Sequence, residues 1–133
     1  MHPVFADTFY FLAHLNTKDA RHRAALEAAG KPRRRFVTTE YVLIELGDAF
    51  HKPQDRDDYL SIVRVVTTDA AWEIVPSSHA LFQRGQEIFR RHRDKKWQLT
   101  DCLSFAVMRQ RHLREALTGD GQFEQAGFRA LLR

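Results

Sequence analysis

The sequence contains a single cysteine, Cys102, and no long apolar run. One cysteine excludes an internal disulfide and is compatible with a reducing compartment. The longest apolar runs, such as 41–44, are far shorter than the roughly 20 residues that a membrane-spanning helix needs. The N-terminal residues also lack the basic and hydrophobic segments of a secretory signal peptide. We therefore expect a cytoplasmic protein.

Several common catalytic and cofactor motifs are also missing. The 7 histidines contain no His-x-x-x-His pair, and the lone cysteine completes no zinc-ligand spacing. No Gly-rich phosphate-binding loop follows a predicted strand. The segment 119–121, Gly-Asp-Gly, precedes no convincing helix. Zinc chemistry and phosphate-loop nucleotide binding are therefore disfavoured.

Length and composition are typical of one globular domain. The 133 residues are 44% hydrophobic and 29% charged, which predicts one domain over residues 1–133. Short apolar runs alternate with helical patterns, which predicts an α/β fold with a largely parallel sheet. Strands are predicted at 4–6, 36–38, 72–75 and 116–118, with 128–132 as a fifth edge strand. Helices are predicted at 8–15, 19–29, 39–50, from about 53 through 66, at 78–91 and at 100–112.

The chain has a net charge of +4 and a sequence pI of about 9.6, which permits a polyanionic partner without requiring one. Basic residues gather in three segments, 31–35, 90–96 and 109–114. Each segment by itself is typical of a solvated helix end or loop. Three of them in so short a chain favour nucleic acid weakly as the partner.

Four acidic residues differ in placement from those on predicted helix surfaces. Asp7 directly follows the predicted strand 4–6, and Asp120 comes two residues after the predicted strand 116–118. Asp101 stands in the first turn of a predicted helix, and Glu45 lies beside the apolar stripe of another. The carboxyl ends of parallel strands share one edge of a sheet, where ligands bind. We therefore expect these four side chains to converge at that edge.

Such a cluster would be electrostatically unfavourable by itself. Two like charges about 4 Å apart repel by about 4 kcal/mol at an effective dielectric constant of about 20. Bound cations or protonation must therefore relieve the repulsion, and oxygen ligands select hard cations such as Mg²⁺ or Mn²⁺. Structural alternatives stay open: Asp7 or Asp101 could cap a helix. Asp120 could serve a turn, and Glu45 could pair with a basic side chain.

The sequence resembles the PIN-domain ribonucleases and, within them, the VapC-like toxins of bacterial toxin–antitoxin pairs. The opening segment, Val-Phe-Ala-Asp-Thr, is similar to the first family motif, a hydrophobic strand that ends in Asp followed by Ser or Thr. The most specific match is the third motif, which begins Leu-Thr-Asp-Cys. The four matching segments follow the order of the family motifs: 4–8, 38–46, 99–108 and 116–128.

The resemblance implies a three-layer α/β/α fold with a central parallel sheet of four or five strands. It also implies metal-dependent endonucleolytic cleavage of RNA, a homodimer, and a cognate antitoxin that inserts into the active-site groove. On this basis the expected ligands of Mg²⁺ or Mn²⁺, and the expected catalytic residues, are Asp7, Glu45, Asp101 and Asp120. Asp120 lies between two glycines, which makes its turn looser than the family pattern.

The main alternative is a catalytically silent PIN fold that serves as an RNA-binding or assembly scaffold. The intact acidic positions argue against it, since a scaffold has no physical need to crowd negative charge. A nucleotide-binding α/β domain is a further alternative, and the missing phosphate loop disfavours it.

Overall fold

The computed structural model describes residues 2–133, and Met1 lies outside that range. Five parallel strands form one sheet in the order β3-β2-β1-β4-β5. Because β2 lies on one side of β1 and β4 on the other, the chain changes direction at β1. Such a switch point opens a crevice outside the carboxyl ends of the strands. The strands are β1 (Val4–Ala6), β2 (Phe36–Thr39), β3 (Trp72–Val75), β4 (Glu115–Leu117) and β5 (Arg129–Ala130).

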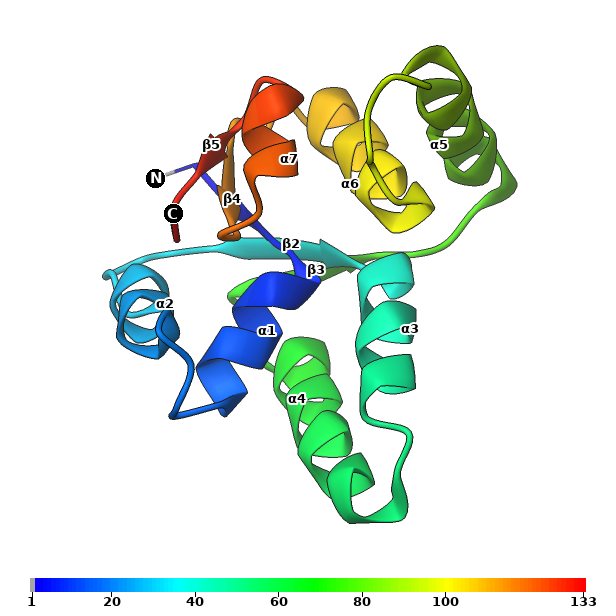
Figure 1. Cartoon of the computed structure of the whole chain (residues 1–133). Coiled ribbons are helices and arrows are strands. Elements are labelled where there is room, and N and C mark those ends of the chain that lie inside the picture. The colour runs from blue at the N-terminus through cyan, green and yellow to red at the C-terminus, as the bar shows by residue number, and fades with distance from the viewer. Residues whose placement is uncertain (1) are drawn as a thin grey trace.

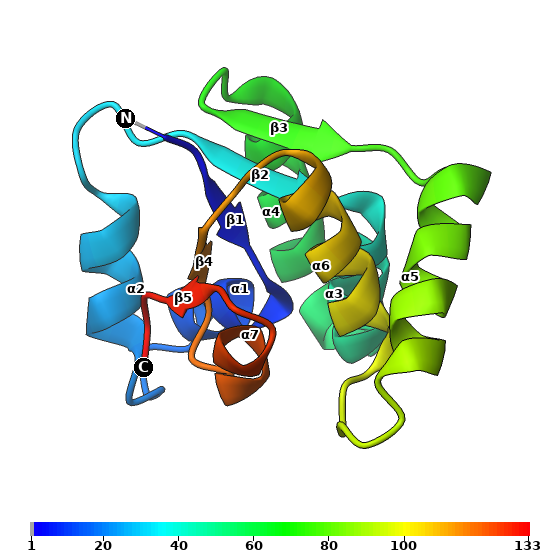
Figure 2. The same ribbon diagram turned by 90° about the horizontal axis from the view of Figure 1, so that it is seen from above.

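Helices cover both faces of the sheet. Figure 1 shows α1 to α4 on one face and α5 to α7 on the other, and Figure 2 shows the same layers from above. The predicted three-layer α/β/α fold is therefore confirmed, with five strands. The helices are α1 (Thr8–Leu15), α2 (His22–Ala29), α3 (Glu40–Ala49), α4 (Arg56–Thr68), α5 (His79–Arg91), α6 (Leu99–Gln110) and α7 (Gly121–Gln125), with a 3-10 turn, η1 (Pro53–Asp55), before α4.

Within the described residues, no helix is both long enough and apolar enough to cross a membrane.

The core fills both faces of the sheet, and its most continuous part lies between the sheet and α6. All of β1 is buried, and α6 is buried continuously from Asp101 to Met108. The aromatic ring of Phe123 from α7 contacts Phe105 of α6 at 5.0 Å and Phe5 of β1 at 6.4 Å between ring centroids. Buried aromatic side chains contribute strongly to stability through their large apolar area. This packing fixes the start of α6 over the end of β1.

Gly85 lets α5 approach α6 closely. A Cβ atom at this position would lie 2.5 Å from Cδ2 and 3.3 Å from Cα of Leu103. Side-chain rotation cannot move that Cα, so we expect Gly85→Ala to destabilise the protein by about 1–3 kcal/mol. The gain in helix propensity, about 1 kcal/mol, does not offset the clash. A thermal melt should show a midpoint several degrees lower.

Gly47→Ala is the matched control. A Cβ at Gly47 meets only the ring of Tyr59, at 3.2 Å, and that ring can shift. Its melting temperature should therefore stay near that of the wild type. If Gly85→Ala has the same melting temperature as the wild type, the close packing of α5 on α6 is contradicted.

Three details differ from the sequence-based prediction. α2 begins at His22 rather than Asp19, because the Asp19 carboxylate accepts a hydrogen bond from the Arg21 amide and holds a turn there. α6 ends at Gln110, because His112 adopts a left-handed backbone with φ 56°. A short helix, α7, follows Asp120, where no helix was predicted. Five residues are too few to produce a readable periodic pattern.

Candidate active site

Asp7 and Thr118 meet at the switch point of the sheet. Asp7 directly follows β1, and Thr118 directly follows β4, the strand paired with it. The Thr118 hydroxyl, which is fully buried, donates a hydrogen bond of 2.9 Å to Oδ2 of Asp7. Asp7 also occupies the N-cap position of α1, but its carboxylate makes no capping hydrogen bond. The helix-cap alternative therefore does not explain this residue.

Asp120 lies close to the same point through Thr118. Its backbone amide donates to the Thr118 hydroxyl at 3.1 Å. Its carboxylate accepts a hydrogen bond of 2.9 Å from the Gln122 amide and so caps α7. The structural alternative for Asp120 is therefore confirmed, and the second oxygen of its carboxylate, Oδ2, receives no hydrogen bond within residues 2–133.

Glu45 reaches the site from α3. Its carboxylate accepts a hydrogen bond from the Thr8 hydroxyl, which ties α3 to the start of α1. No basic side chain in the described part of the chain forms an ion pair with Glu45. The ion-pair alternative for Glu45 is therefore wrong, and a neutral hydroxyl orients this carboxylate instead.

Asp101 is held at the first turn of α6. Its Oδ2 accepts a hydrogen bond of 3.1 Å from the Gln98 amide, as part of a capping box. The helix-cap alternative is thus confirmed for Asp101, but it accounts for only one of the two oxygens. The side chain is 7% exposed, so the other oxygen is nearly withdrawn from water.

Burial and repulsion from neighbouring carboxylates raise the pKa values of two of these groups. Burial raises the pKa of Asp7 to about 6, and the Glu45 charge adds to this effect, while the Thr118 hydroxyl and the amides at the start of α1 oppose it. Burial also raises the pKa of Asp101 to about 7, with further contributions from the charges of Asp7, Asp120 and Glu45. Asp101 therefore lies within electrostatic reach of the other three carboxyl groups, and Asp7 lies within reach of Glu45.

The four carboxyl groups gather without a positive neighbour. None of them takes part in an ion pair within the part of the chain that the structure describes. Within the same residues, no three acidic, histidine or cysteine side chains are already close enough to enclose a metal ion. The donor set nevertheless fits a hard cation, since it consists of carboxylate oxygens whose charge nothing else neutralises.

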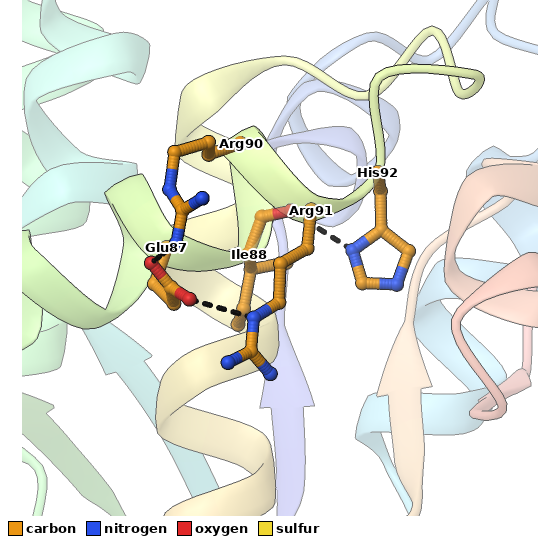
Figure 3. A network of polar contacts seen from close by, with 5 residues as sticks. All are labelled: Glu87, Ile88, Arg90, Arg91 and His92. Carbon is orange, nitrogen blue, oxygen red and sulfur yellow. Dashed lines mark hydrogen bonds and ion pairs between the residues drawn. The ribbon is translucent and has the colours of Figure 1, made fainter.

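Some side chains of the basic segments are engaged within the protein. Figure 3 shows Arg90 and Arg91 both directed at Glu87, at 2.5 Å and 2.6 Å, on the last turns of α5. Arg34 is buried and donates to the carbonyl of Ala28. These contacts reduce the free positive charge of two segments, and the evidence for a nucleic-acid partner comes mainly from the acidic site.

The fold and the site together define the class: a three-layer α/β/α protein with an acidic cluster at the switch point of its sheet. The sequence matches the PIN domain family over residues 4–129. The chain therefore belongs to the PIN domain family.

Individual relatives agree with this assignment. The 23S rRNA-specific endonuclease VapC20 of Mycobacterium tuberculosis is 28% identical over 126 residues, which are 94% of this chain and 95% of the relative. The crystal structure of VapC20, a sarcin–ricin loop cleaving toxin, matches with a TM-score of 0.81 and 27% identity over 94% of this chain and 95% of that one. The predicted likeness to PIN-domain ribonucleases and VapC toxins is confirmed.

More distant structures share the fold alone. VapBC2 of Rickettsia felis, bound to a DNA fragment from its promoter, matches with a TM-score of 0.69 and 14% identity over 97% of each chain. VapBC-1 of nontypeable Haemophilus influenzae matches with a TM-score of 0.70 and 9% identity over 99% of this chain and 100% of that one.

Proposed function

We propose that this protein is a divalent-metal-dependent endoribonuclease and the toxin of a toxin–antitoxin pair. Asp7, Glu45, Asp101 and Asp120 are the proposed ligands of Mg²⁺ or Mn²⁺. One observation carries the proposal: burial and neighbouring carboxylates raise the pKa of Asp7 to about 6 and of Asp101 to about 7, and none of the four carboxylates forms an ion pair within residues 2–133. Carboxyl groups whose pKa values are strongly perturbed by burial and like charge gather at functional sites.

The protein's own side chains would orient the reacting groups. Thr118 fixes Asp7, and Thr8 fixes Glu45, so hydroxyl donors set the directions of two carboxylates before substrate binds. The Gln98 amide holds one oxygen of Asp101 and leaves the other free. When bound, the divalent ion would supply Lewis-acid activation of water and stabilise charge on the phosphate. The expected products carry 5′-phosphate and 3′-hydroxyl ends.

The partners belong to the same proposal. RNA is the proposed substrate, because the relative of 28% identity is a 23S rRNA-specific endonuclease. A cognate antitoxin and a homodimer follow from the likeness to VapC toxins, and several structures of the same fold are VapBC proteins. An enzyme that cuts RNA would act in the cytoplasm, where ribosomal and transfer RNA are found. A catalytically silent scaffold is disfavoured, since it would gain nothing from crowded, uncompensated carboxylates.

Divalent ions should switch on RNA cleavage by the purified protein. We expect a mixed RNA substrate to be cut in Mg²⁺ or Mn²⁺ and to stay intact in excess EDTA, with activity restored when the metal is returned. Gel electrophoresis and 5′-phosphate-dependent ligation would measure the cutting and the product ends. Cleavage that persists in EDTA, or products with 5′-hydroxyl ends, would contradict the proposed chemistry.

A further inference from the structure

A small pocket opens beside the acidic site, between α3 and α6. Its volume is about 270 Å³, less than the roughly 300–1,000 Å³ of pockets that hold drug-sized ligands. The size therefore suits a single ring system. The lining residues are Tyr41, Ile44, Glu45, Asp48, Thr100 and Leu103.

The pocket adjoins the proposed reaction site directly. Glu45 belongs to both, and Thr100 immediately precedes Asp101. If RNA is the substrate, a nucleotide next to the scissile phosphate would reach this pocket. This inference therefore rests on the proposed function and concerns which base the enzyme selects.

The walls of the pocket combine apolar surface with a rigid aromatic ring. Ile44 is 59% exposed, so its apolar side chain is available to a ligand. The Tyr41 hydroxyl both donates to the carbonyl and accepts from the amide of Ser78, at 3.0 Å each, so the ring is held in place. Unstacked RNA bases bind against surfaces of this kind, and a base stacked on an aromatic side chain contributes about 1–3 kcal/mol.

Asp48 supplies the polar selectivity. Its exposed carboxylate accepts no side-chain hydrogen bond and forms no ion pair within residues 2–133. A carboxylate can only accept hydrogen bonds and repels phosphate, so it favours a base that presents N–H donors. Guanine presents two neighbouring donors, N1–H and N2–H, on its Watson–Crick edge, and two carboxylate oxygens can accept both.

We infer that the pocket between α3 and α6 binds a guanine base of the RNA substrate, with Asp48 accepting its two Watson–Crick donors and Tyr41 and Ile44 packing against its ring. Discrimination by a paired contact of this kind amounts to about 1–3 kcal/mol, or roughly 5- to 150-fold.

Binding measured without cleavage tests the inference. Fluorescent five-nucleotide RNAs with a single central guanine, inosine, adenine or cytosine between uridines would be titrated with the protein in EDTA. Inosine lacks the N2 amino group and so removes one of the two donors. We expect wild-type protein to bind the guanine RNA roughly 5- to 150-fold more tightly than the adenine RNA, with inosine between them. In Asp48→Asn the guanine preference should disappear.

Matched variants separate base recognition from charge and packing. Asp57→Asn removes the same charge from α4, outside the pocket, and should keep the guanine preference. Ile44→Ser should weaken binding of all four RNAs and keep their order. Equal binding of guanine and inosine by the wild type, or an unchanged preference in Asp48→Asn, would overturn the inference. The inference would also be overturned if Ile44→Ser bound all four RNAs as the wild type does but sedimented as a monomer where the wild type is a dimer.

A second readout distinguishes this inference from the proposed function. Sequencing the ends produced from a randomised single-stranded RNA pool in Mn²⁺ would show guanine enriched at one position beside the cut, and Asp48→Asn should remove the enrichment. Cleavage without any guanine enrichment would contradict guanine recognition by the pocket and would still support the nuclease proposal. Guanine binding that depends on Asp48, without cleavage under any metal, would support the pocket and contradict the nuclease proposal.

Discussion

Replacing Asp7 by Asn is expected to lower RNA cleavage by roughly 10²–10³-fold, as loss of one preorganised electrostatic group does in other enzymes, while making the metal-free protein more stable. Asn keeps the size of the side chain and can still accept the hydrogen bond from Thr118. It cannot supply the negative charge that would hold a divalent ion. Cleavage rates of both proteins in Mn²⁺, on the same RNA, would measure the first effect.

The gain in stability has a defined pH dependence. Burial raises the pKa of Asp7 from 3.8 to about 6 in the folded protein, so ionisation at neutral pH destabilises the fold. The penalty is absent below about pH 4, grows as the pH rises to about 6, and is complete above it. We therefore expect Asp7→Asn to add about 1–3 kcal/mol at pH 8 and little at pH 4. Urea unfolding at both pH values measures this difference.

Asp57→Asn serves as the control, because it removes one exposed carboxylate from α4 and should change neither cleavage nor the pH profile. If Asp7→Asn cleaves RNA at the wild-type rate, or if it is less stable than the wild type at pH 8 in EDTA, the role assigned to this carboxyl group is wrong.

Mn²⁺ is expected to raise the melting temperature of the wild-type protein by roughly 5–10 °C at pH 8. A ligand at 100 times its dissociation constant stabilises a fold by about 2.7 kcal/mol, and 1 kcal/mol corresponds to a few degrees for a domain of this size. The effect should shrink at pH 5.5, because protons compete for Asp7 and Asp101, whose pKa values are raised to about 6 and about 7. Differential scanning fluorimetry with and without Mn²⁺ gives the shift.

Asp101→Asn provides the comparison for the metal effect. Asn can still accept the Gln98 amide and so preserve the start of α6. Its melting temperature should rise in EDTA at pH 8 and respond much less to Mn²⁺ than that of the wild type. If Mn²⁺ does not change the melting temperature of the wild type at pH 8, the assignment of all four residues as metal ligands is contradicted.

The sequence predicts the layout of the fold and the neighbourhood of the site well, for a simple reason. A short continuous apolar run followed by an acidic residue marks the end of a buried strand, and parallel strands end at one edge. Asp7 therefore lies at the switch point, as expected. The third motif likewise places Asp101 at the start of a helix. Both inferences need only local pattern and chain direction.

Contacts between distant elements lie beyond such patterns. The Thr8–Glu45 hydrogen bond joins residues that are 37 positions apart, and the Thr118–Asp7 bond joins residues that are 111 apart. Each depends on side-chain rotamers that packing decides. Asp48 also escaped notice, because a polar residue on a helix surface looks the same in sequence whether or not a pocket adjoins it.

The capping box of α6 makes Asp101 a component of the scaffold as well as of the acidic cluster. A lineage that loses toxicity can discard the negative charge of Asp7 and gain stability at once. At position 101 the same loss must preserve an acceptor for the Gln98 amide, so Asn or Ser is tolerated where Ala is not. Inactive descendants of this protein should therefore retain a small polar residue at position 101, and at position 7 a neutral side chain that still accepts the hydrogen bond from Thr118.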